Sequence, residues 1–230
     1  MKRILAGASF LAATLCTSHA VITWTGAADT NIFNDANWDF SASGVSTISS
    51  NTSIADDVII SGGNVEIPNE GGQVRFQLGN GFTLTVDNST VAPVAGGNDG
   101  VGGEPGSTGV NVNIINGGNF NPFFIVNAVA LDLDGTSSAT FGGGGNPINL
   151  STVNLTAGST LAFLAETPAA YTAEHLSKTT VNGAAAVDGV NIAIAPFNGN
   201  LGSTISVIPE PSGAMLLGLA GFALILRRRK

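Results

Sequence analysis

The feature of this sequence that most constrains the fold is a recurring unit in which a turn of small residues separates two short apolar strands. Glycines mark the turns of five such units, with spacings of 18, 37, 17 and 23 residues, and stand at Gly63, Gly81, Gly118, Gly135 and Gly158. Many of the strands alternate apolar and polar residues, which is the period of a strand buried on one face. The nearest approach to a helical pattern, at 169–178, is short.

A period of about 20 residues is typical of one coil of a β-solenoid, in which stacked coils bury a core that no coil can bury alone. The 37-residue spacing is about twice 18, so we expect one poorly matching copy within the Gly-rich stretch 95–109. We therefore predict an all-β fold whose body is a short parallel β-helix. An antiparallel β-sandwich, which also uses short strands joined by turns, is the alternative.

Nine runs bounded by Gly, Asn and Asp are expected to be strands, and they are 57–61, 64–67, 73–78, 82–86, 110–115, 123–126, 129–133, 148–155 and 160–164. Two further segments are expected to be irregular. The segment 94–109 is rich in glycine and has no large apolar residue, so it predicts a mobile loop or an insertion in a coil. The segment 196–208 is expected to be a flexible linker that follows a β-rich body over 21–195.

The N-terminus has the pattern of a secretory signal peptide. Lys2 and Arg3 precede a short apolar core over 4–16, and Ser18, His19 and Ala20 supply a cleavage site with small residues. We predict a signal helix over 1–20 that is cut after Ala20, so the body is exported. The sole cysteine lies in this signal, which excludes disulfides and thiol catalysis from the exported form.

The last 22 residues combine three signals. Pro209, Glu210 and Pro211 come first, an uncharged apolar run follows over 213–226, and a basic cluster ends the chain at Arg227, Arg228, Arg229 and Lys230. An apolar helix that ends in cations is typical of a membrane stop, with the cations on the cytoplasmic side. We therefore predict a C-terminal transmembrane helix, although 14 residues span only about 21 Å of a hydrocarbon core of about 30 Å.

This order of parts resembles the PEP-CTERM sorting signal of Gram-negative bacteria. The resemblance covers 209–230 and implies that the chain is the substrate of a membrane-embedded exosortase, which cuts near the Pro-Glu-Pro motif and releases or transfers the body. It also implies passage through the inner membrane, a final place at the cell surface or outside the cell, and an association with exopolysaccharide or biofilm. An ordinary single-pass tail anchor is the alternative.

Charge narrows the partners of the exported body. Between residues 21 and 208 there are 15 acidic residues and two basic ones, Arg75 and Lys178, so the body carries about −13. Nucleic acids and anionic membranes are bound by clustered Lys and Arg, which this body lacks. The composition suits cations, neutral glycans or water as partners, and we predict no nucleic-acid binding.

The start of the body resembles the opening of exported β-helical proteins of the autotransporter-repeat kind. The residues that carry the resemblance are Trp24-Thr-Gly26 and Asn34-Asp-Ala-Asn-Trp38. Its physical interpretation is a cap, because two Trp side chains can cover the open end of a solenoid. Two ordinary core tryptophans of any β fold are the alternative.

The search for chemistry yields no predicted catalytic residue, cofactor or metal ligand. His175 is the only histidine after signal removal. A Ser-His-Asp triad is conceivable, but no Gly-x-Ser-x-Gly motif accompanies His175, so we expect it to be a polar surface residue. A zinc site is not expected with one His, no Cys and no carboxylates clustered at ligand spacing. Asp132 and Asp134 open an EF-hand-like loop that fails at its sixth and twelfth positions, which leaves weak cation binding or a solvated strand face.

The function predicted from these observations is an exported, non-enzymatic protein of the cell surface or extracellular matrix. A secreted carbohydrate-active β-helix enzyme is one alternative, for which Asp56, Asp57, Asp132 and Asp134 would have to converge. A glycan-binding module is the other, and it would need a row of exposed aromatic side chains.

Overall fold

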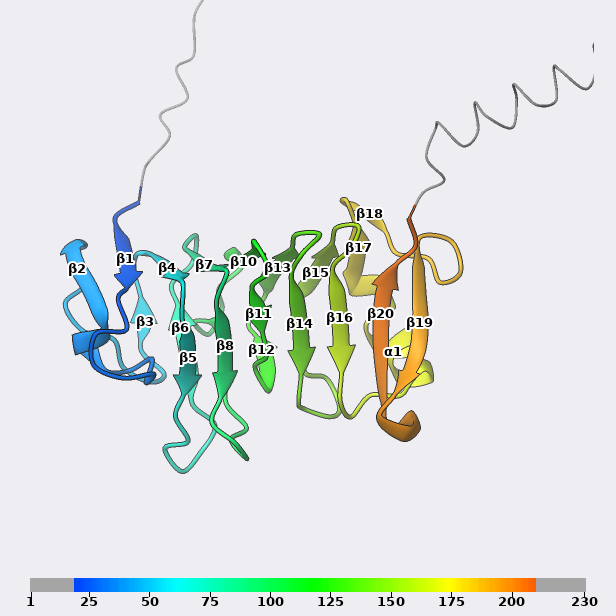
Figure 1. Ribbon diagram of the computed structural model, residues 1–230, viewed down its shortest axis with the longest axis horizontal. Coiled ribbons are helices and arrows are strands. Elements are labelled where there is room, and N and C mark those ends of the chain that lie inside the picture. Colours follow the sequence, from blue (N-terminus) through cyan, green and yellow to red (C-terminus); the bar gives the residue numbers. More distant parts are fainter. Residues whose placement is uncertain (1–18, 210–230) are drawn as a thin grey trace, which may run out of the picture.

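The computed structural model describes residues 19–209, which form a β-solenoid of about 5 turns that lies horizontally in Figure 1. Strands that are distant in the chain stack side by side in three sheets. In spatial order the first sheet contains β18 (Ala184–Ala185), β17 (Thr179–Val181), β15 (Thr152–Leu155), β13 (Val129–Leu133), β10 (Val110–Ile115), β7 (Thr83–Asp87), β4 (Asp57–Ser61), β1 (Val21–Trp24) and β2 (Trp38–Ala42).

The second sheet contains β19 (Ile192–Phe197), β20 (Gly202–Val207), β16 (Thr160–Phe163), β14 (Ser138–Phe141), β11 (Asn119–Phe120), β8 (Thr90–Pro93) and β5 (Asn64–Ile67). The third contains β12 (Phe124–Val126), β9 (Gly100–Gly103), β6 (Arg75–Leu78) and β3 (Ser53–Ile54). The helical elements are short, and they are η1 (Asp35–Asn37), α1 (Pro168–Glu174), η2 (Leu176–Lys178) and η3 (Asn198–Asn200).

Parallel pairing between successive coils confirms the predicted solenoid and excludes the antiparallel sandwich. Strand β10, for example, pairs in parallel with β7 on one side and β13 on the other. Within the described part of the chain, the antiparallel pairs are β1–β2, β17–β18, β16–β20 and β19–β20, and all of them lie at the two ends of the stack. The body is therefore a parallel stack that is closed at each end by reversed strands.

The coils differ in length. Aligned positions in the first sheet are Val58, Leu84, Val112, Leu131 and Val153, which are 26, 28, 19 and 22 residues apart. The predicted period of about 20 therefore holds for the later coils only. The glycine spacings did not give the coil length, because Gly81 is not equivalent to the other four glycines. Gly81 precedes β7 at the corner between the third and first sheets, whereas the other four lie between the first and second sheets.

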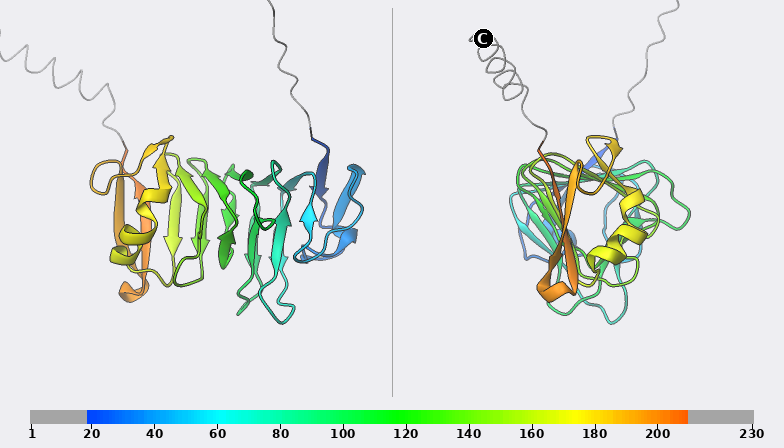
Figure 2. Two further views of the ribbon diagram at one scale, coloured as in Figure 1. Left: turned by 180° about the vertical axis from the view of Figure 1, so that it is seen from behind. Right: turned by 90° about the vertical axis from the view of Figure 1, so that its right-hand side faces the viewer.

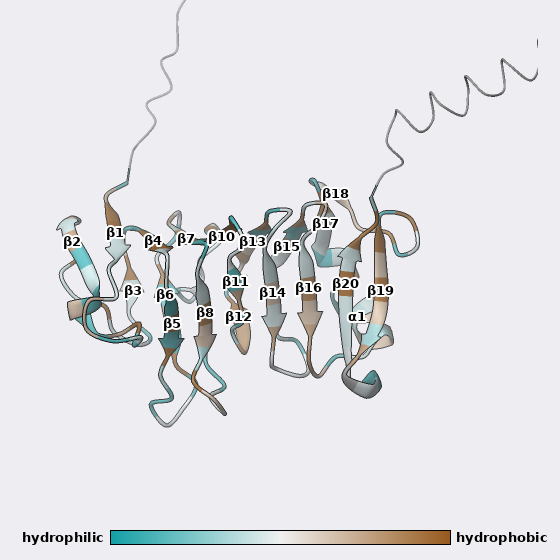
Figure 3. Cartoon of the chain, in the orientation of Figure 1, coloured by the Kyte–Doolittle hydropathy of each residue, from teal (hydrophilic) through white to brown (hydrophobic). Residues whose placement is uncertain are grey.

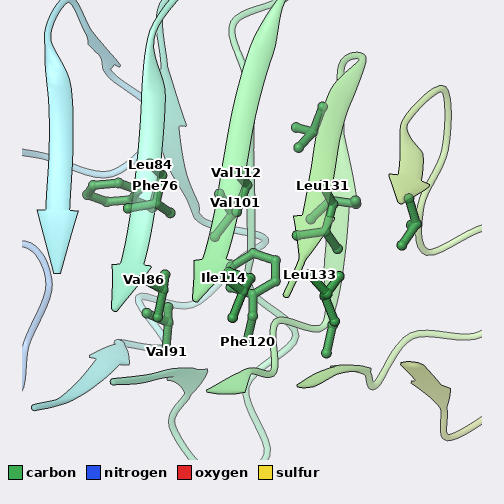
Figure 4. Close-up of a cluster of buried hydrophobic side chains, with 14 of the residues drawn as sticks. Phe76, Leu84, Val86, Val91, Val101, Val112, Ile114, Phe120, Leu131 and Leu133 are labelled. Carbon is green, nitrogen blue, oxygen red and sulfur yellow. The ribbon is translucent and has the colours of Figure 1, made fainter. Parts of the chain in front are cut away.

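The core is built from alternate residues of the strands. In β10 the buried residues are Val110, Val112 and Ile114, and in β13 they are Val129, Leu131 and Leu133. Neighbouring coils place these side chains in rows, as the close-up of the core shows (Figure 4). Each such side chain contributes about 1.5–3 kcal/mol when it is fully buried. Hydrophilic and hydrophobic residues accordingly interleave along the strands (Figure 3).

In three coils the corner between the first and second sheets begins with a residue in the left-handed conformation. The residue directly after the first-sheet strand has a φ of 73° at Gly62, 45° at Asn88 and 54° at Asn116. Asparagine tolerates this conformation better than other residues with a side chain. Asn and Gly are thus required at this corner in these three coils, whereas Asp134 and Thr156 stand at the same place in the next two.

Two tryptophans close the N-terminal end, in agreement with the cap interpretation. Trp24 of β1 and Trp38 of the edge strand β2 are each 6% exposed, and their rings meet edge to face with centroids 4.9 Å apart. The Trp38 indole N–H donates to the Ile32 carbonyl at 2.8 Å.

At the other end of the solenoid, α1 takes the place that a third-sheet strand has in earlier coils, since it follows β16 and precedes β17 (Figure 2). The hairpin of β19 and β20 then adds to β16 in the second sheet. Residues 169–178, the segment nearest to a helical pattern in the sequence, correspond to α1 and η2.

Two segments that were predicted to be irregular contain paired strands. The stretch 94–109 contains β9, whose four residues are all buried between β6 and β12. β9 is the third-sheet strand of its coil, so the stretch is not one continuous mobile loop, although residues 94–99 and 104–109 lie outside strands as predicted. The predicted linker 196–208 consists largely of paired strands, because β19 and β20 pair over six residues. The folded body therefore extends to Val207, beyond the predicted limit at residue 195.

Among residues 19–209, no helix combines the length and the apolar character that are needed to cross a membrane. The predicted signal helix lies almost entirely outside the described residues, and so does the predicted transmembrane helix at 213–226.

Candidate functional site

Most of the residues predicted to direct sorting lie outside the described residues, namely Glu210, Pro211 and the basic cluster 227–230. Pro209 is described, and it is exposed two residues after the end of β20. The predicted signal cleavage position, Ala20, directly precedes β1, and its carbonyl accepts a hydrogen bond from the backbone N–H of Asp57 at 3.1 Å. The first residue of the predicted mature chain is therefore the first residue of the solenoid.

The described residues contain one group of potential metal ligands, which lies at the C-terminal end of the solenoid. Ligand atoms of Glu166, Glu174 and His175 all lie within 4.8 Å of one another. Glu166 stands just before Thr167, which caps α1 by accepting from the N–H of Ala170. Glu174 ends α1, and His175 caps its C-terminus. The short helix thus brings residues from both of its ends together.

His175 is fully buried, so the predicted surface position is wrong. Its ring stacks on Phe163 of β16 with centroids 5.1 Å apart and an interplanar angle of 10°. Tyr171 lies one turn earlier on the same face of α1, and its hydroxyl pairs with Thr179 Oγ1 at 2.8 Å. The imidazole therefore packs against aromatic side chains in the core and not on the surface.

Neither ring nitrogen of His175 has a hydrogen-bond partner, and the backbone of Glu174 approaches the ring without forming a bond of normal geometry. Burial, and to a lesser degree the charge of Lys178, lower the pKa of His175 to about 4 against the opposing effect of the charge and backbone of Glu174. The imidazole is therefore neutral at neutral pH, and one of its nitrogens offers a lone pair.

Glu166 is also buried, at 3% exposure, and its Oε1 has no partner. Burial raises the pKa of Glu166, and the neighbouring Glu174 carboxylate raises it further, while the backbone N–H of Gly145 opposes the shift. The position thus holds a carboxyl group at a place that disfavours its negative charge.

Asp134 has a structural role. Its carboxylate accepts from the Asn116 backbone N–H at 2.6 Å, from the backbone N–H and hydroxyl of Thr136 at 2.9 Å each, and from Ser137 Oγ at 2.7 Å. Partial burial would raise the pKa of Asp134, but these hydrogen bonds outweigh it and lower the pKa to about 2. Asp132 accepts from Asn154 Nδ2 at 2.9 Å. Asp134 therefore joins its own turn to the turn of the preceding coil.

The carboxylates considered for glycan hydrolysis do not form one group. Asp57 lies on β4 and Asp132 on β13, which are three strand positions apart in the first sheet. With about 4.8 Å between neighbouring strands this separation is about 14 Å, whereas paired glycosidase carboxyl groups stand about 5–9.5 Å apart. Asp56 accepts from Ser43 Oγ, and Asp57 accepts from the N–H of Thr83.

The described surface also offers little for aromatic stacking on sugars. Both tryptophans are buried in the N-terminal cap, and Phe197 is the single aromatic residue among the large exposed apolar ones in the described chain. A shallow hollow of about 380 Å³ lies at the corner between the first and second sheets, and its lining has no aromatic or charged residue: it consists of Gly62, Gly63, Asn64, Asn88, Ser89, Thr90, Gly117 and Asn119.

No family model, curated protein or solved structure matches this chain.

The cluster around His175 was missed by the sequence analysis, although one local signal was present. Tyr171 and His175 are four residues apart, which places them on one face of a helix. A large aromatic residue on that face indicates the buried side. The position of Glu166 depends on how the chain leaves β16, and the residue pattern does not reveal it.

Proposed function

We propose that this chain is an exported, non-enzymatic protein of the cell surface or extracellular matrix, delivered by a C-terminal sorting signal of the PEP-CTERM type. The observation that carries the proposal is the order Pro209-Glu210-Pro211, apolar run, Arg227-Arg228-Arg229-Lys230. An exosortase and the export machinery would be its partners, with the inner membrane as a transient location and exopolysaccharide as the material with which the body associates.

The end of the folded body supports this proposal. β20 ends at Val207, and the backbone N–H of Ile208 donates to the Asn191 carbonyl at 2.9 Å. The exposed Pro209 follows immediately. A cut at the motif would therefore release the whole solenoid, with its C-terminal hairpin intact. It would also remove four of the eight basic residues of the chain.

The character of the body fits a structural cargo. Reversed strands end the stack on both sides. Asp57 and Asp132 lie too far apart to act as a pair of glycosidase carboxyl groups. A stacked, acidic, strongly hydrogen-bonded body is suited to persistence outside the cell. The enzyme and glycan-binding alternatives gain no specific support from the described residues.

The test is the mature C-terminus of the protein in a host that contains an exosortase. We expect intact-mass analysis of the exported wild-type protein to show a chain that ends near Pro209. Glu210→Ala, or deletion of residues 227–230, should leave the full tail on a protein retained in the inner membrane. Glu70→Ala, which removes an exposed glutamate of the body, is the matched control and should be processed normally. Normal processing of both tail variants would refute the proposal.

A further inference from the structure

The cluster at the C-terminal end of the solenoid has two unsatisfied buried residues that point to a ligand. His175 has no exposed surface and no partner for either ring nitrogen, and the buried Oε1 of Glu166 has none either. A buried polar group without a partner loses its hydration and gains no hydrogen bond in return, so it destabilises the fold. One cation placed between the two residues would satisfy a nitrogen lone pair and a carboxylate oxygen at once.

The carboxyl groups of the cluster would also attract a cation. Glu166 and Glu174 bring two carboxyl groups to one place, with ligand atoms within 4.8 Å of each other and of His175. The nearest base, Lys178, directs its ammonium group elsewhere, because Nζ donates to the Asn149 carbonyl at 2.6 Å and to Asn146 Oδ1 at 3.1 Å. Negative charge in the cluster is therefore not neutralised by a direct ion pair among the described residues.

We propose that Glu166, Glu174 and His175 bind a divalent transition-metal ion of the zinc class. One imidazole nitrogen with carboxylate oxygens is a donor set that suits zinc and its neighbours, whereas Ca²⁺ and Mg²⁺ prefer oxygen ligands alone. Water completes the coordination on the side of the exposed Glu174.

The geometry requires only a small adjustment. In a tetrahedral site with bonds of about 2.0–2.2 Å, two ligand atoms lie about 3.3–3.6 Å apart. All ligand atoms of the cluster lie within 4.8 Å of one another, so the farthest pair must close by about 1.5 Å at most. We expect most of the adjustment to come from Glu174, because its side chain is exposed and free to rotate, whereas Glu166 and the stacked imidazole are buried.

Such an ion would act as a clamp on the C-terminal cap. Glu166 lies in the connection that follows β16, and Glu174 and His175 lie at the far end of α1. A metal bond between them holds the helix against the last complete coil, next to the hairpin that closes the second sheet. Binding to the folded state alone would raise the melting temperature of the protein.

The experiment uses the full chain in detergent micelles, stripped with EDTA and titrated with Zn²⁺ in competition with a chromogenic chelator. We expect one ion per chain in the cluster, and a melting temperature several degrees higher with zinc than without it. Glu174→Gln should weaken binding by about tenfold or more and remove the thermal shift. His175→Gln and Glu166→Gln should do the same, and 1 mM Mg²⁺ should produce no shift.

Glu174 is exposed, so its substitution does not test the fold itself. Glu70→Gln, an exposed glutamate at the other end of the body, is the matched control and should bind as the wild type does. The inference is overturned if the wild type shows no saturable zinc binding. It is equally overturned if Glu174→Gln and His175→Gln bind zinc with unchanged affinity, because the ion would then occupy another place in the chain.

Discussion

At the scale of single residues, polar side chains at the turns hold the coils together. Asp134 accepts four hydrogen bonds, one of which comes from the Asn116 backbone in the preceding coil, and Asn116 Nδ2 donates in turn to Asp87 at 2.8 Å. The carboxylate that looked like part of a cation site is therefore occupied by donors of the protein. Its neighbour Asp132 accepts from one side chain, that of Asn154.

We expect Asp134→Ala to lower the free energy of unfolding by about 2 kcal/mol, because it leaves the Asn116 N–H and the turn donors without their acceptor. The matched control Asp132→Ala should cost about 1 kcal/mol or less. Urea denaturation of the two variants and the wild type at pH 7 measures both values. Equal losses for the two variants would contradict the assigned role.

The effect should depend on pH in a defined direction. The pKa of Asp134 is lowered to about 2 in the folded state, from an ordinary value of 3.8. The charged carboxylate therefore stabilises the fold above about pH 4, and this contribution is lost as the pH falls towards 2. The difference in stability between the wild type and Asp134→Ala should shrink over that interval.

At the scale of elements, close approach between coils decides where glycine is required. Strand β9 consists of Gly100, Val101, Gly102 and Gly103 and lies between β6 and β12. A Cβ added at Gly100 would lie 2.4 Å from the Phe124 carbonyl oxygen and 2.5 Å from its ring. The glycine-rich composition of this segment favoured a loop. The close approach of β12 instead requires residues without a Cβ at Gly100 and Gly102 of the strand.

Gly100→Ala should therefore destabilise the solenoid by about 1–3 kcal/mol, since β12 must move away from β9. Gly72→Ala is the control, because a Cβ at Gly72 meets nothing within 4 Å and the residue lies outside the strands. Its stability should stay within about 0.5 kcal/mol of the wild type. Chemical denaturation followed by circular dichroism compares the two, and a wild-type midpoint for Gly100→Ala would argue against the close packing of the third sheet.

At the scale of the whole molecule, the solenoid is a stack with both ends covered and an acidic surface. Reversed strands form the edges at both ends of the stack, with β2 at the N-terminal end and β18 and β19 at the C-terminal end. Among the described residues there is one ion pair, the exposed contact of His19 with Asp57 at 3.4 Å. Repulsion between acidic groups is thus offset by few direct attractions.

We expect sodium chloride to stabilise the folded protein, because screening weakens this self-repulsion more than it weakens attractive pairs. The melting temperature should rise between about 10 and 150 mM salt and then level off, as the Debye length falls to about 8 Å. Sucrose at matched osmolality controls for non-ionic effects. A melting temperature that falls with added salt would show that attractive ion pairs dominate.

The predicted strands show how far local patterns reach. The ranges 57–61, 64–67, 110–115 and 129–133 agree with β4, β5, β10 and β13 residue for residue. Each of these runs alternates apolar and polar side chains or is bounded by turn residues, and these properties act within a few residues. Strands such as β11, with two residues, are too short to give a pattern of their own.

The sequence by itself determined the β character of the body and favoured stacked coils over a sandwich, because the alternation of apolar and polar residues is a local requirement of each strand, and Asn or Gly is a local requirement of several corners. Only the tertiary structure decided that β9 is a strand, since its partners β6 and β12 come from other coils, and that the hairpin of β19 and β20 joins the second sheet through β16. It also decided the burial of His175 beside Glu166 and Glu174. The contacts that bury these groups form only when α1 packs on the last coil: the spacing of Tyr171 and His175 indicates a shared helix face, but no local pattern places Glu166 beside them.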